Sequence, residues 1–541
     1  MTPLELTLLA LATIVGLSLR GYHLGDSALT HFDEGVYAFS GFGLATPSEA
    51  VHLFPDQQKF SPPVYFSLVA LANLLGGAPE RSPFVVNVLM GTLSIPVLWA
   101  FVRRWFGGVA AIAAAWLLAM SEFHIIMSRT ALTDVTFALT FLVALGAVLV
   151  AIERGTLSSA AVAGVAVGLA WNTKYHGWFA LVVGVMVIGG RWRLQHAGVV
   201  WARRALRSWL VMSVVAALCY APWFYFIQEQ PGSSAGWLSY FATMLRLDWF
   251  GNLWRQIAQQ GYLEGPWSRA SVPLAIVASD LVARQRGRGA PSLLAPAFAA
   301  AAWAIGSAGC ALVLALVALG RGWKRGVTGP LWLLGAVIAL WVLMAPLYHP
   351  YFRLILPFAV ATFALGGAAL DGWMAPRRRP PWPLAGLAAA AVVGVLTAWR
   401  PDPSNPWRPT RGLSDVAQAM DAAIPAGAPV SVLGEPALAF YLHRRGHPSF
   451  ERTTLESLDS LTASRYLVTG VYLRRSSSMR TRFQARRERI ESLGRYPVGI
   501  PSDLRLLDDF TPDSAGWWIH APDTTYDVLL YRLAPPPGRV R

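Results

Sequence analysis

The sequence contains little charge and few cysteines. Charged residues make up 14% of the 541 residues, against about 25% in a typical soluble globular protein. Its two cysteines, Cys219 and Cys310, lie inside apolar runs, where we expect small buried side chains rather than a disulfide bridge or metal site. Composition excludes disorder, a collagen-like chain and a disulfide scaffold. With 55% hydrophobic residues and a mean hydropathy of +0.44, it indicates a polytopic membrane protein.

Lysine is almost absent. Only Lys59, Lys174 and Lys324 occur among the 45 basic residues, which outnumber 30 acidic residues and give a net charge of +15. Most arginines cluster beside apolar runs, as they do in the cytoplasmic loops of membrane proteins. No basic face interleaved with stacking aromatics stands outside those loops, which argues against nucleic-acid binding.

The arginine clusters orient the predicted spans. They lie at Arg103–Arg104, Glu153–Arg154, Arg191 to Arg207, Arg321 to Arg325 and Arg377 to Arg379. Threading apolar runs between them predicts an all-α membrane domain of about eleven transmembrane helices, with the N-terminus inside and the C-terminus outside. The predicted spans are 4–20, 82–102, 107–121, 133–151, 157–172, 176–190, 208–227, 295–319, 330–347, 351–370 and 382–398. Arg284 to Arg288 would mark a further inside loop and change the count by one or two.

This topology divides the chain into a membrane domain, 1–398, and a soluble extracytoplasmic domain, 399–541. Residues 21–81 form a first outer loop whose apolar segment from Pro62 to Leu75 we expect to lie at the interface as a helix. Residues 228–294 are predicted to form a second long outer loop. In the tail, apolar residues from Leu413 onward recur at helical spacing. Short runs rich in β-forming residues begin near Pro429, Tyr466 and Val528. The expected result is a small α/β domain.

Polar residues gather on the predicted outer face. Ionisable groups at membrane depth are costly and by default mark a functional site. The candidates are Asp33, Glu34, Lys59, Arg129, Asp134, Lys174, Tyr351 and Arg353. Carboxylates beside cations suit group transfer from a lipid-linked phosphate. One carboxylate acts as general base toward the attacking hydroxyl, and cations stabilise the leaving phosphate. The chain contains no P-loop and no dinucleotide-binding fingerprint.

Simpler interpretations stand beside these. The pair Asp33–Glu34 also fits a solvated loop, Asp134 fits a helix N-cap, and Lys174 and Arg353 fit side chains that snorkel to the interface. The histidines of the outer face fit hydrogen-bonding roles better than metal ligation, because no ligand spacing links them. The sequence names no cofactor. A divalent metal ion stays open, although the adjacent Asp33 and Glu34 alone make a poor chelate.

Four stretches resemble a known family. They are Asp33–Glu34 with Tyr37, Lys59 with Pro62–Pro63–Val64–Tyr65, Ser128–Arg129 with Asp134, and Trp171 to Tyr175 around Lys174. Tyr351–Phe352–Arg353 with Pro357 extends the similarity. In this order and on one membrane face, the stretches resemble the C-type, lipid-sugar-dependent membrane glycosyltransferases, specifically protein O-mannosyltransferases and lipid A aminoarabinose transferases. The similarity covers roughly 1–200 and, less closely, 340–370.

The resemblance implies a polyprenyl-phosphate or dolichyl-phosphate sugar donor and an inverting transfer on the outer face. By the same analogy, Asp33 is the general base, Glu34 supports it, and Asp134 positions the acceptor or the sugar. Lys59, Arg129, Lys174, Tyr351 and Arg353 contact the donor phosphate or lipid. The acceptor would be a protein, a lipid or a glycan. The chain departs from the family at Phe60, where members often carry a small or polar residue.

Two other functions compete with a glycosyltransferase. A transporter or lipid flippase usually shows internal repeats and polar residues near the bilayer midplane, and this chain shows neither clearly. A catalytically idle scaffold would present the 399–541 domain outside. The expected location is the cytoplasmic membrane of a bacterium, with the site on the periplasmic face, because arginine over lysine and alanine-rich usage suggest a high-GC genome.

Overall fold

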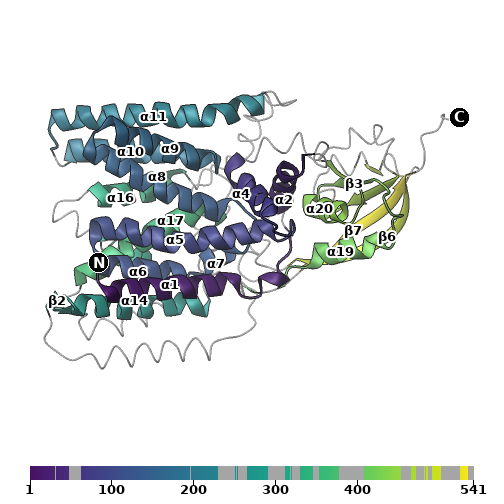
Figure 1. Cartoon of the computed structure of the whole chain (residues 1–541), viewed down its shortest axis with the longest axis horizontal. Coiled ribbons are helices and arrows are strands. Elements are labelled where there is room, and N and C mark those ends of the chain that lie inside the picture. The colour runs from purple at the N-terminus through teal and green to yellow at the C-terminus, as the bar shows by residue number, and fades with distance from the viewer. Residues whose placement is uncertain are drawn as a thin grey trace.

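The computed structural model places membrane-type helices in a bundle and a small sheet domain beyond one end of it (Figure 1). It describes residues 1–30, 32–47, 62–194, 196–228, 250–251, 253, 265–289, 311–316, 318–319, 329–344, 352–373, 375–376, 407, 409–452, 465–470, 481, 483–484, 490–500 and 524–533. The predicted spans 382–398 and most of 295–319 lie outside these ranges, as do Lys59, Tyr351 and Cys310.

Long apolar helices run side by side through the bundle (Figure 1). They are α1 (Pro3–Gly21), α5 (Ser82–Phe106), α6 (Gly108–Ala119), α8 (Asp134–Arg154), α9 (Leu157–Trp171), α10 (Phe179–Leu194), α11 (Val199–Gln228), α14 (Pro266–Arg284), α16 (Gly329–Met344) and α17 (Leu356–Trp373). Among the described residues, five helical segments are long and apolar enough to cross a membrane. The bent pair of α6 and α7 (Glu122–Ser128), with an angle of 60°, would make a sixth.

Helices occupy every predicted span that lies within the described residues, but the count of eleven is not confirmed. Two regions depart from the sequence-based expectation. Residues 266–284, expected in an outer loop, form α14, which packs along α6 and ends at Arg284. Strand β1 (Arg288–Gly289) then pairs with β2 (Ala375–Pro376), directly before an arginine cluster expected on the inside. Cys219, expected to be buried, is exposed on α11.

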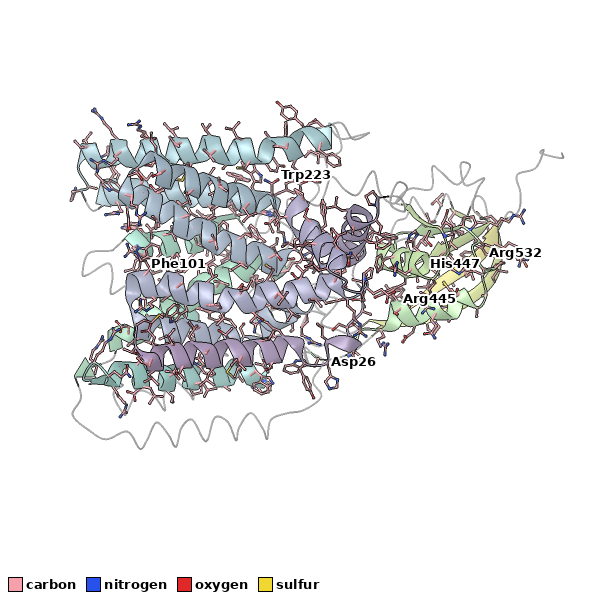
Figure 2. The ribbon with its side chains drawn as sticks, viewed as in Figure 1. Asp26, Phe101, Trp223, Arg445, His447 and Arg532 are labelled. Atoms are coloured by element: carbon pink, nitrogen blue, oxygen red, sulfur yellow. The ribbon has the colours of Figure 1, made fainter. Side chains whose placement is uncertain are left out.

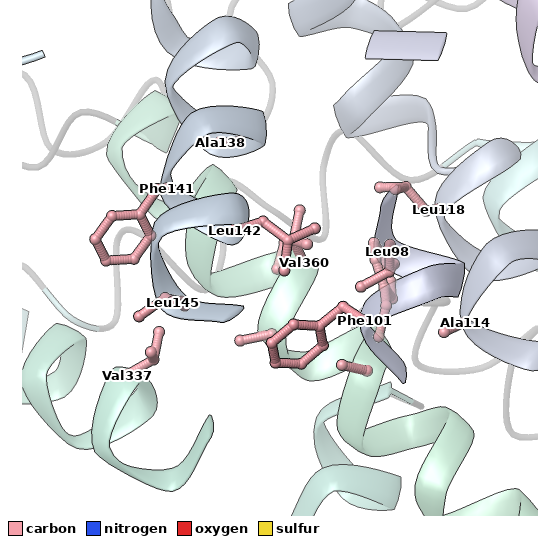
Figure 3. Packing of buried hydrophobic residues seen from close by; sticks show 14 of the residues in the cluster. Leu98, Phe101, Ala114, Leu118, Ala138, Phe141, Leu142, Leu145, Val337 and Val360 are labelled. Atoms are coloured by element: carbon pink, nitrogen blue, oxygen red, sulfur yellow. The ribbon is translucent and has the colours of Figure 1, made fainter. Parts of the chain in front are cut away.

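Helix α6 lies at the centre of the bundle. Its sequence is apolar all round, which is typical of a fully buried helix, and nearly all of its residues are buried. It packs against α1, α5, α14 and α17. Small residues allow the close approach: a Cβ on Gly367 of α17 would lie 2.3 Å from the carbonyl oxygen of Ala110. Figure 3 shows the neighbouring core, where Phe101, Leu142 and Val360 lie on three different helices.

Two shorter helices lie between the bundle and the sheet domain (Figure 1). They are α2 (Phe32–Ala45) and α4 (Pro63–Leu74), which pack against each other, with Gly41 seated on Val69. The predicted helix from Pro62 to Leu75 is confirmed as α4. Pro63 begins it, as suits a residue that lacks a backbone N–H.

Within its described residues, the C-terminal region forms a mixed five-stranded sheet together with the helices Gly412–Asp421 and Pro436–Arg444, as expected for a small α/β domain. The strand order is β4-β3-β5-β7-β6, with β3 parallel to β4 and β5, and β7 antiparallel to β5 and β6. The elements are α19 (Gly412–Asp421), β3 (Val430–Leu433), α20 (Pro436–Arg444), β4 (Ser449–Arg452), β5 (Tyr466–Thr469), β6 (Ile490–Ile500) and β7 (Thr524–Leu533).

The small domain is tightly joined to the chain segment between α1 and α2. The backbone N–H of Leu29 donates to the Tyr441 hydroxyl over 2.7 Å, and that of Ala28 donates to Thr410 Oγ1 over 2.8 Å. Helix α20 packs on α2, with the Phe39 and Phe440 rings edge to face at 5.2 Å. The two regions therefore share one apolar core.

Candidate active site

The adjacent carboxylates at the start of α2 have different surroundings. Glu34 is buried, and its two oxygens accept hydrogen bonds from the backbone N–H groups of Thr30 and Ala131, each over 2.8 Å. Asp33 keeps 28% of its side chain exposed, and its Oδ2 accepts from Arg353 Nη2 over 2.9 Å. Glu34 therefore ties two loops together, whereas Asp33 faces a more open space.

A second ion pair joins Asp134 to Lys174. Asp134 is the first residue of α8, where a carboxylate is favoured by the helix dipole. Lys174 lies in the turn between α9 and η3 (Tyr175–Trp178), and its Nζ donates to Asp134 Oδ1 over 2.6 Å. Burial lowers the pKa of the Lys174 ammonium, and the charge of Asp134 opposes that shift. The sequence also allowed Asp134 to be the N-cap of α8. The N-cap is Thr133, so that interpretation is wrong.

The two ion pairs form one cluster. Lys174 interacts electrostatically with Arg353 and Asp33 as well as with Asp134. Tyr37, one turn after Asp33, is buried and interacts electrostatically with Asp33, Arg353 and Asp134. Four segments that are distant in sequence thus meet at one point: α2, α8, the turn before η3, and η5 (Phe352–Ile355).

A cavity of about 210 Å³ opens beside this cluster. Asp134, Lys174 and Arg353 lie in its wall, and the remaining wall is largely aromatic and aliphatic. Those other lining residues are Phe137, Phe141, His176, Phe179, Val337, Leu340, Trp341, Met344, Leu354, Pro357 and Phe358. Within the described part of the chain, Oδ2 of the buried Asp134 has no hydrogen-bond partner. The pocket is therefore apolar except at one end, where two cations and a carboxylate acceptor lie.

Arg129 does not join the cluster, contrary to the expectation that it contacts the donor. It is 5% exposed, and its Nη1 donates to the carbonyl oxygens of Arg20 (2.7 Å) and Tyr22 (2.6 Å). These carbonyls stand at the C-terminal end of α1, where helices leave acceptors unsatisfied. The guanidinium therefore caps α1. Lys59 and Tyr351 lie outside the described residues.

No group of three or more potential ligands (histidine, cysteine, aspartate or glutamate) that could hold a metal ion occurs within the described ranges. Asp33 and Asp134 are instead each paired with a cation of the chain.

Comparisons with known proteins bear on the sequence and the fold of the chain. Residues 61–226 match the sequence model of the dolichyl-phosphate-mannose-protein mannosyltransferase family. No curated protein sequence matches the chain significantly. Among solved structures, the oligosaccharyltransferase AglB from Archaeoglobus fulgidus, in complex with an inhibitory peptide and a dolichol-phosphate, superposes with a TM-score of 0.56 at 14% identity, over 87% of this chain and 70% of that one.

The chain has the fold of the C-type membrane glycosyltransferases. The resemblance seen in the sequence is thereby confirmed, and the class that both comparisons indicate is a membrane glycosyltransferase. ArnT from Cupriavidus metallidurans bound to undecaprenyl phosphate also aligns, with a TM-score of 0.47 and 17% identity over 96% of this chain and 97% of that one.

The family match within this glycosyltransferase fold contains Asp134 and Lys174, whereas Asp33 and Arg353 lie outside it. The fold brings all four together. Asn87 is a further residue that sequence reasoning missed. Its side-chain amide donates to the carbonyl oxygens of Thr130 and Leu132 over 2.5 and 2.6 Å, and so fixes the loop that leads to Asp134. The sequence feature that could have identified Asn87 is the presence of an asparagine inside the apolar run that forms α5.

Proposed function

We propose that this protein transfers a sugar from a polyprenyl-phosphate carrier to an acceptor hydroxyl, with inversion at the anomeric carbon. The observation that carries the proposal is the pocket, whose apolar walls end at Lys174, Arg353 and Asp134. A prenyl chain suits the aromatic wall, and a phosphate suits two cations. The dolichol-phosphate in complex with AglB, a protein of the same fold, supports a donor of this kind.

The chemical step is a single displacement. The acceptor oxygen attacks the anomeric carbon, and the bond between that carbon and the phosphate oxygen breaks. The electron pair of this bond leaves with the phosphate, whose charge rises, and Lys174 and Arg353 stabilise that charge. Asp33 accepts the proton of the acceptor hydroxyl as general base. Attack from the face opposite the leaving group gives inversion.

Exposure and pairing favour Asp33 over Asp134 as the base. The Asp134 side chain is 3% exposed and lies 2.6 Å from Lys174, so it is well placed to hold the ammonium toward the phosphate. Its free Oδ2 suits a hydroxyl of the sugar. Asp33 is the more accessible carboxylate, and a phosphate bound at Arg353 would compete for its partner and leave Asp33 ready to accept a proton.

The remaining assignments follow from position. Glu34 supports Asp33 indirectly by fixing the start of α2, and Arg129 supports the site by capping α1. Lys59 and Tyr351 stay proposed donor contacts. We expect transfer to survive chelation by EDTA, because a divalent ion would have to displace Arg353 and Lys174 from Asp33 and Asp134. The arginine clusters favour a site that faces outward, and the preference for arginine over lysine and the alanine-rich usage favour a bacterial cytoplasmic membrane.

The donor is best identified by trapping it. An Asp33→Asn variant retains both cations but lacks the base, so it should bind the donor without turning it over. Mass spectrometry of lipids that co-purify with this variant in mild detergent should show a prenyl phosphate that carries a sugar. A folded variant that carries bulk phospholipid alone would contradict the proposal and favour a transporter or scaffold.

The phosphate assignment needs its own measurement. Lys174→Ala should weaken binding of undecaprenyl phosphate, used as a probe, about tenfold or more, because a charge-assisted contact is lost. Asp26→Asn is the matched control, since Asp26 lies in the same outer segment but pairs with His23 at the surface. Equal probe affinity in Lys174→Ala and the control would remove Lys174 from the phosphate site.

A further inference from the structure

A second cavity lies between α5, α8 and α9, beside the C-terminal ends of α5 and α8 and therefore at the opposite end of α8 from Asp134. Its volume is about 480 Å³. Arg104 near the end of α5, Arg154 at the end of α8, and Ser158 and Ser159 in the first turn of α9 form its polar edge. We call this cavity the α5–α8 trough.

The α5–α8 trough runs lengthwise along the surface of the bundle, and Val143 and Val162 in its lining are 42% and 67% exposed. Its lining runs along α8 from Arg154 back to Leu142, a separation of twelve residues and about 18 Å of helix. Along α5 it runs from Arg104 to Val97, about 10 Å. Phe101, labelled in Figures 2 and 3, lies in its wall, and Gly146 leaves room opposite that ring. An acyl chain fits these dimensions and this chemistry.

The polar edge of the trough is positively charged, which is opposite to the charge of a phosphate. Arg104 and Arg154 are both exposed, and within the described ranges neither forms an ion pair with a carboxylate. The neighbouring Glu153 points elsewhere, toward Gly329 and Arg191. The N-terminus of α9 adds the positive end of a helix dipole beside Ser158. Two cations and this helix end therefore surround one mouth of an apolar cavity.

We propose that the α5–α8 trough binds one anionic phospholipid from the membrane leaflet at that end. The phosphate lies between Arg104 and Arg154, and one acyl chain follows α8 past Gly146 toward Leu142. Basic pockets between transmembrane helices bind anionic headgroups in this way, and apolar burial holds the chain. The site is separate from the donor pocket and does not depend on the proposed reaction.

The test is a lipid titration of the purified full-length protein, followed by native mass spectrometry. Phosphatidylglycerol and phosphatidylcholine with the same acyl chains are compared. Wild type should bind one phosphatidylglycerol more tightly than phosphatidylcholine. The double variant Arg104→Gln/Arg154→Gln should lose about 30-fold in phosphatidylglycerol affinity, since each cation near a lipid surface contributes about fivefold. The control is Arg203→Gln/Arg207→Gln, which removes two exposed arginines of α11.

A second variant tests the acyl chain rather than the charge. In Gly146→Leu the new side chain would fill the trough beside Phe101, since an added Cβ would lie 3.3 Å from that ring. It should weaken both lipids about tenfold or more while both arginines remain. Equal binding of the two lipids by wild type would overturn the proposal. So would a loss in Arg104→Gln/Arg154→Gln no larger than in the control, or unchanged binding in Gly146→Leu.

Discussion

Two groups of charged and polar side chains lie at the same end of the bundle and use their hydrogen-bonding atoms differently. In the active-site cluster, Arg353 and Lys174 pair with the carboxylates of Asp33 and Asp134 beside a cavity. The other group, which we call the α1–α7 polar cluster, holds no carboxylate and lines neither described cavity. It consists of Arg20, His124, Ser128 and Arg129.

The α1–α7 polar cluster is a buried hydrogen-bonding network, although Nε2 of His124 has no hydrogen-bond partner within the described residues. The guanidinium of Arg20 is fully buried and donates to the carbonyl oxygens of Gly16 (2.8 Å), Ala119 (2.9 Å) and Leu118 (3.1 Å). It also lies 2.9 Å from His124 Nδ1. Arg20 thereby joins α1 to the C-terminal end of α6 through backbone acceptors, and to α7 through the His124 side chain. The cations of the proposed active site differ in that their partners are carboxylate side chains rather than backbone carbonyl oxygens.

The sharpest test of this difference is the loss of the Asp33 base. Asp33→Asn should lower kcat by about 10²- to 10⁴-fold, the usual contribution of a general base. Its thermal unfolding temperature in detergent should stay near that of wild type, because Asp33 is partly exposed. Transfer to an acceptor is measured beside Asp26→Asn. Near-normal turnover in Asp33→Asn would remove it from the base role.

In the α1–α7 polar cluster we expect the opposite result: a substitution should lower the stability of the fold and leave the activity nearly unchanged. Arg20→Met keeps most of the side-chain volume but removes the donors to three carbonyl oxygens, so it should destabilise the fold by about 3 kcal/mol or more. Activity per folded molecule should change only a few-fold. Thermal unfolding in detergent, with Arg203→Met as an exposed control, gives the comparison. A stable Arg20→Met protein that no longer transfers sugar would place Arg20 in the mechanism.

Sequence patterns predicted most of the described helices, the sheet domain and the position at span ends of the four charges that the fold brings together, because spans and span ends are local properties. The family resemblance gave Asp33 and Glu34 different roles, but polarity patterns alone did not separate them, since neighbours on a helix point about 100° apart and only the packing decides which one is buried. Arg129 and Arg353 likewise differ only in the partners that the fold gives them.

Helix α14 was missed for a related reason. Its Ser279 and Asp280 lower the hydropathy that the span prediction depends on. In the bundle, the Ser279 hydroxyl donates to the carbonyl oxygen of Val109, and Asp280 pairs with Arg284 one turn later. Polar groups whose partners lie in the bundle or on the same helix are compatible with a buried helix, but a hydropathy scale cannot recognise those partners.

A smaller perturbation tests whether the sheet domain positions Asp33. Gly35 lies two residues after Asp33, and a Cβ there would stand 2.1 Å from the backbone nitrogen of Ala437 on α20. Gly35→Ala should therefore shift α2, lower kcat about 10- to 100-fold through misplacement of the base, and cost about 1–3 kcal/mol of stability. Gly21→Ala, where a Cβ meets no atom within 4 Å, is the control. Equal kcat in both variants would show that α20 does not position the base.

The smallest change in stability is expected when an ion pair far from both clusters is removed. In the sheet domain, His447 Nε2 lies 2.9 Å from Asp421 Oδ1, and Arg445 lies 3.4 Å from the other oxygen (Figure 2). The hydrogen bond from His447 lowers the pKa of Asp421 below its usual value. A carboxyl with a lowered folded pKa stabilises the fold above its unfolded pKa of about 3.9, and this stabilisation is lost as pH falls through the folded value.

Asp421→Asn should slightly lower the unfolding temperature at pH 7, and the gap to wild type should close on acidification toward pH 3, while sugar transfer stays unchanged. A gap that stays constant with pH would mean that the charge of Asp421 contributes nothing, and that pairing with a cation is not enough to make a carboxylate matter in this protein.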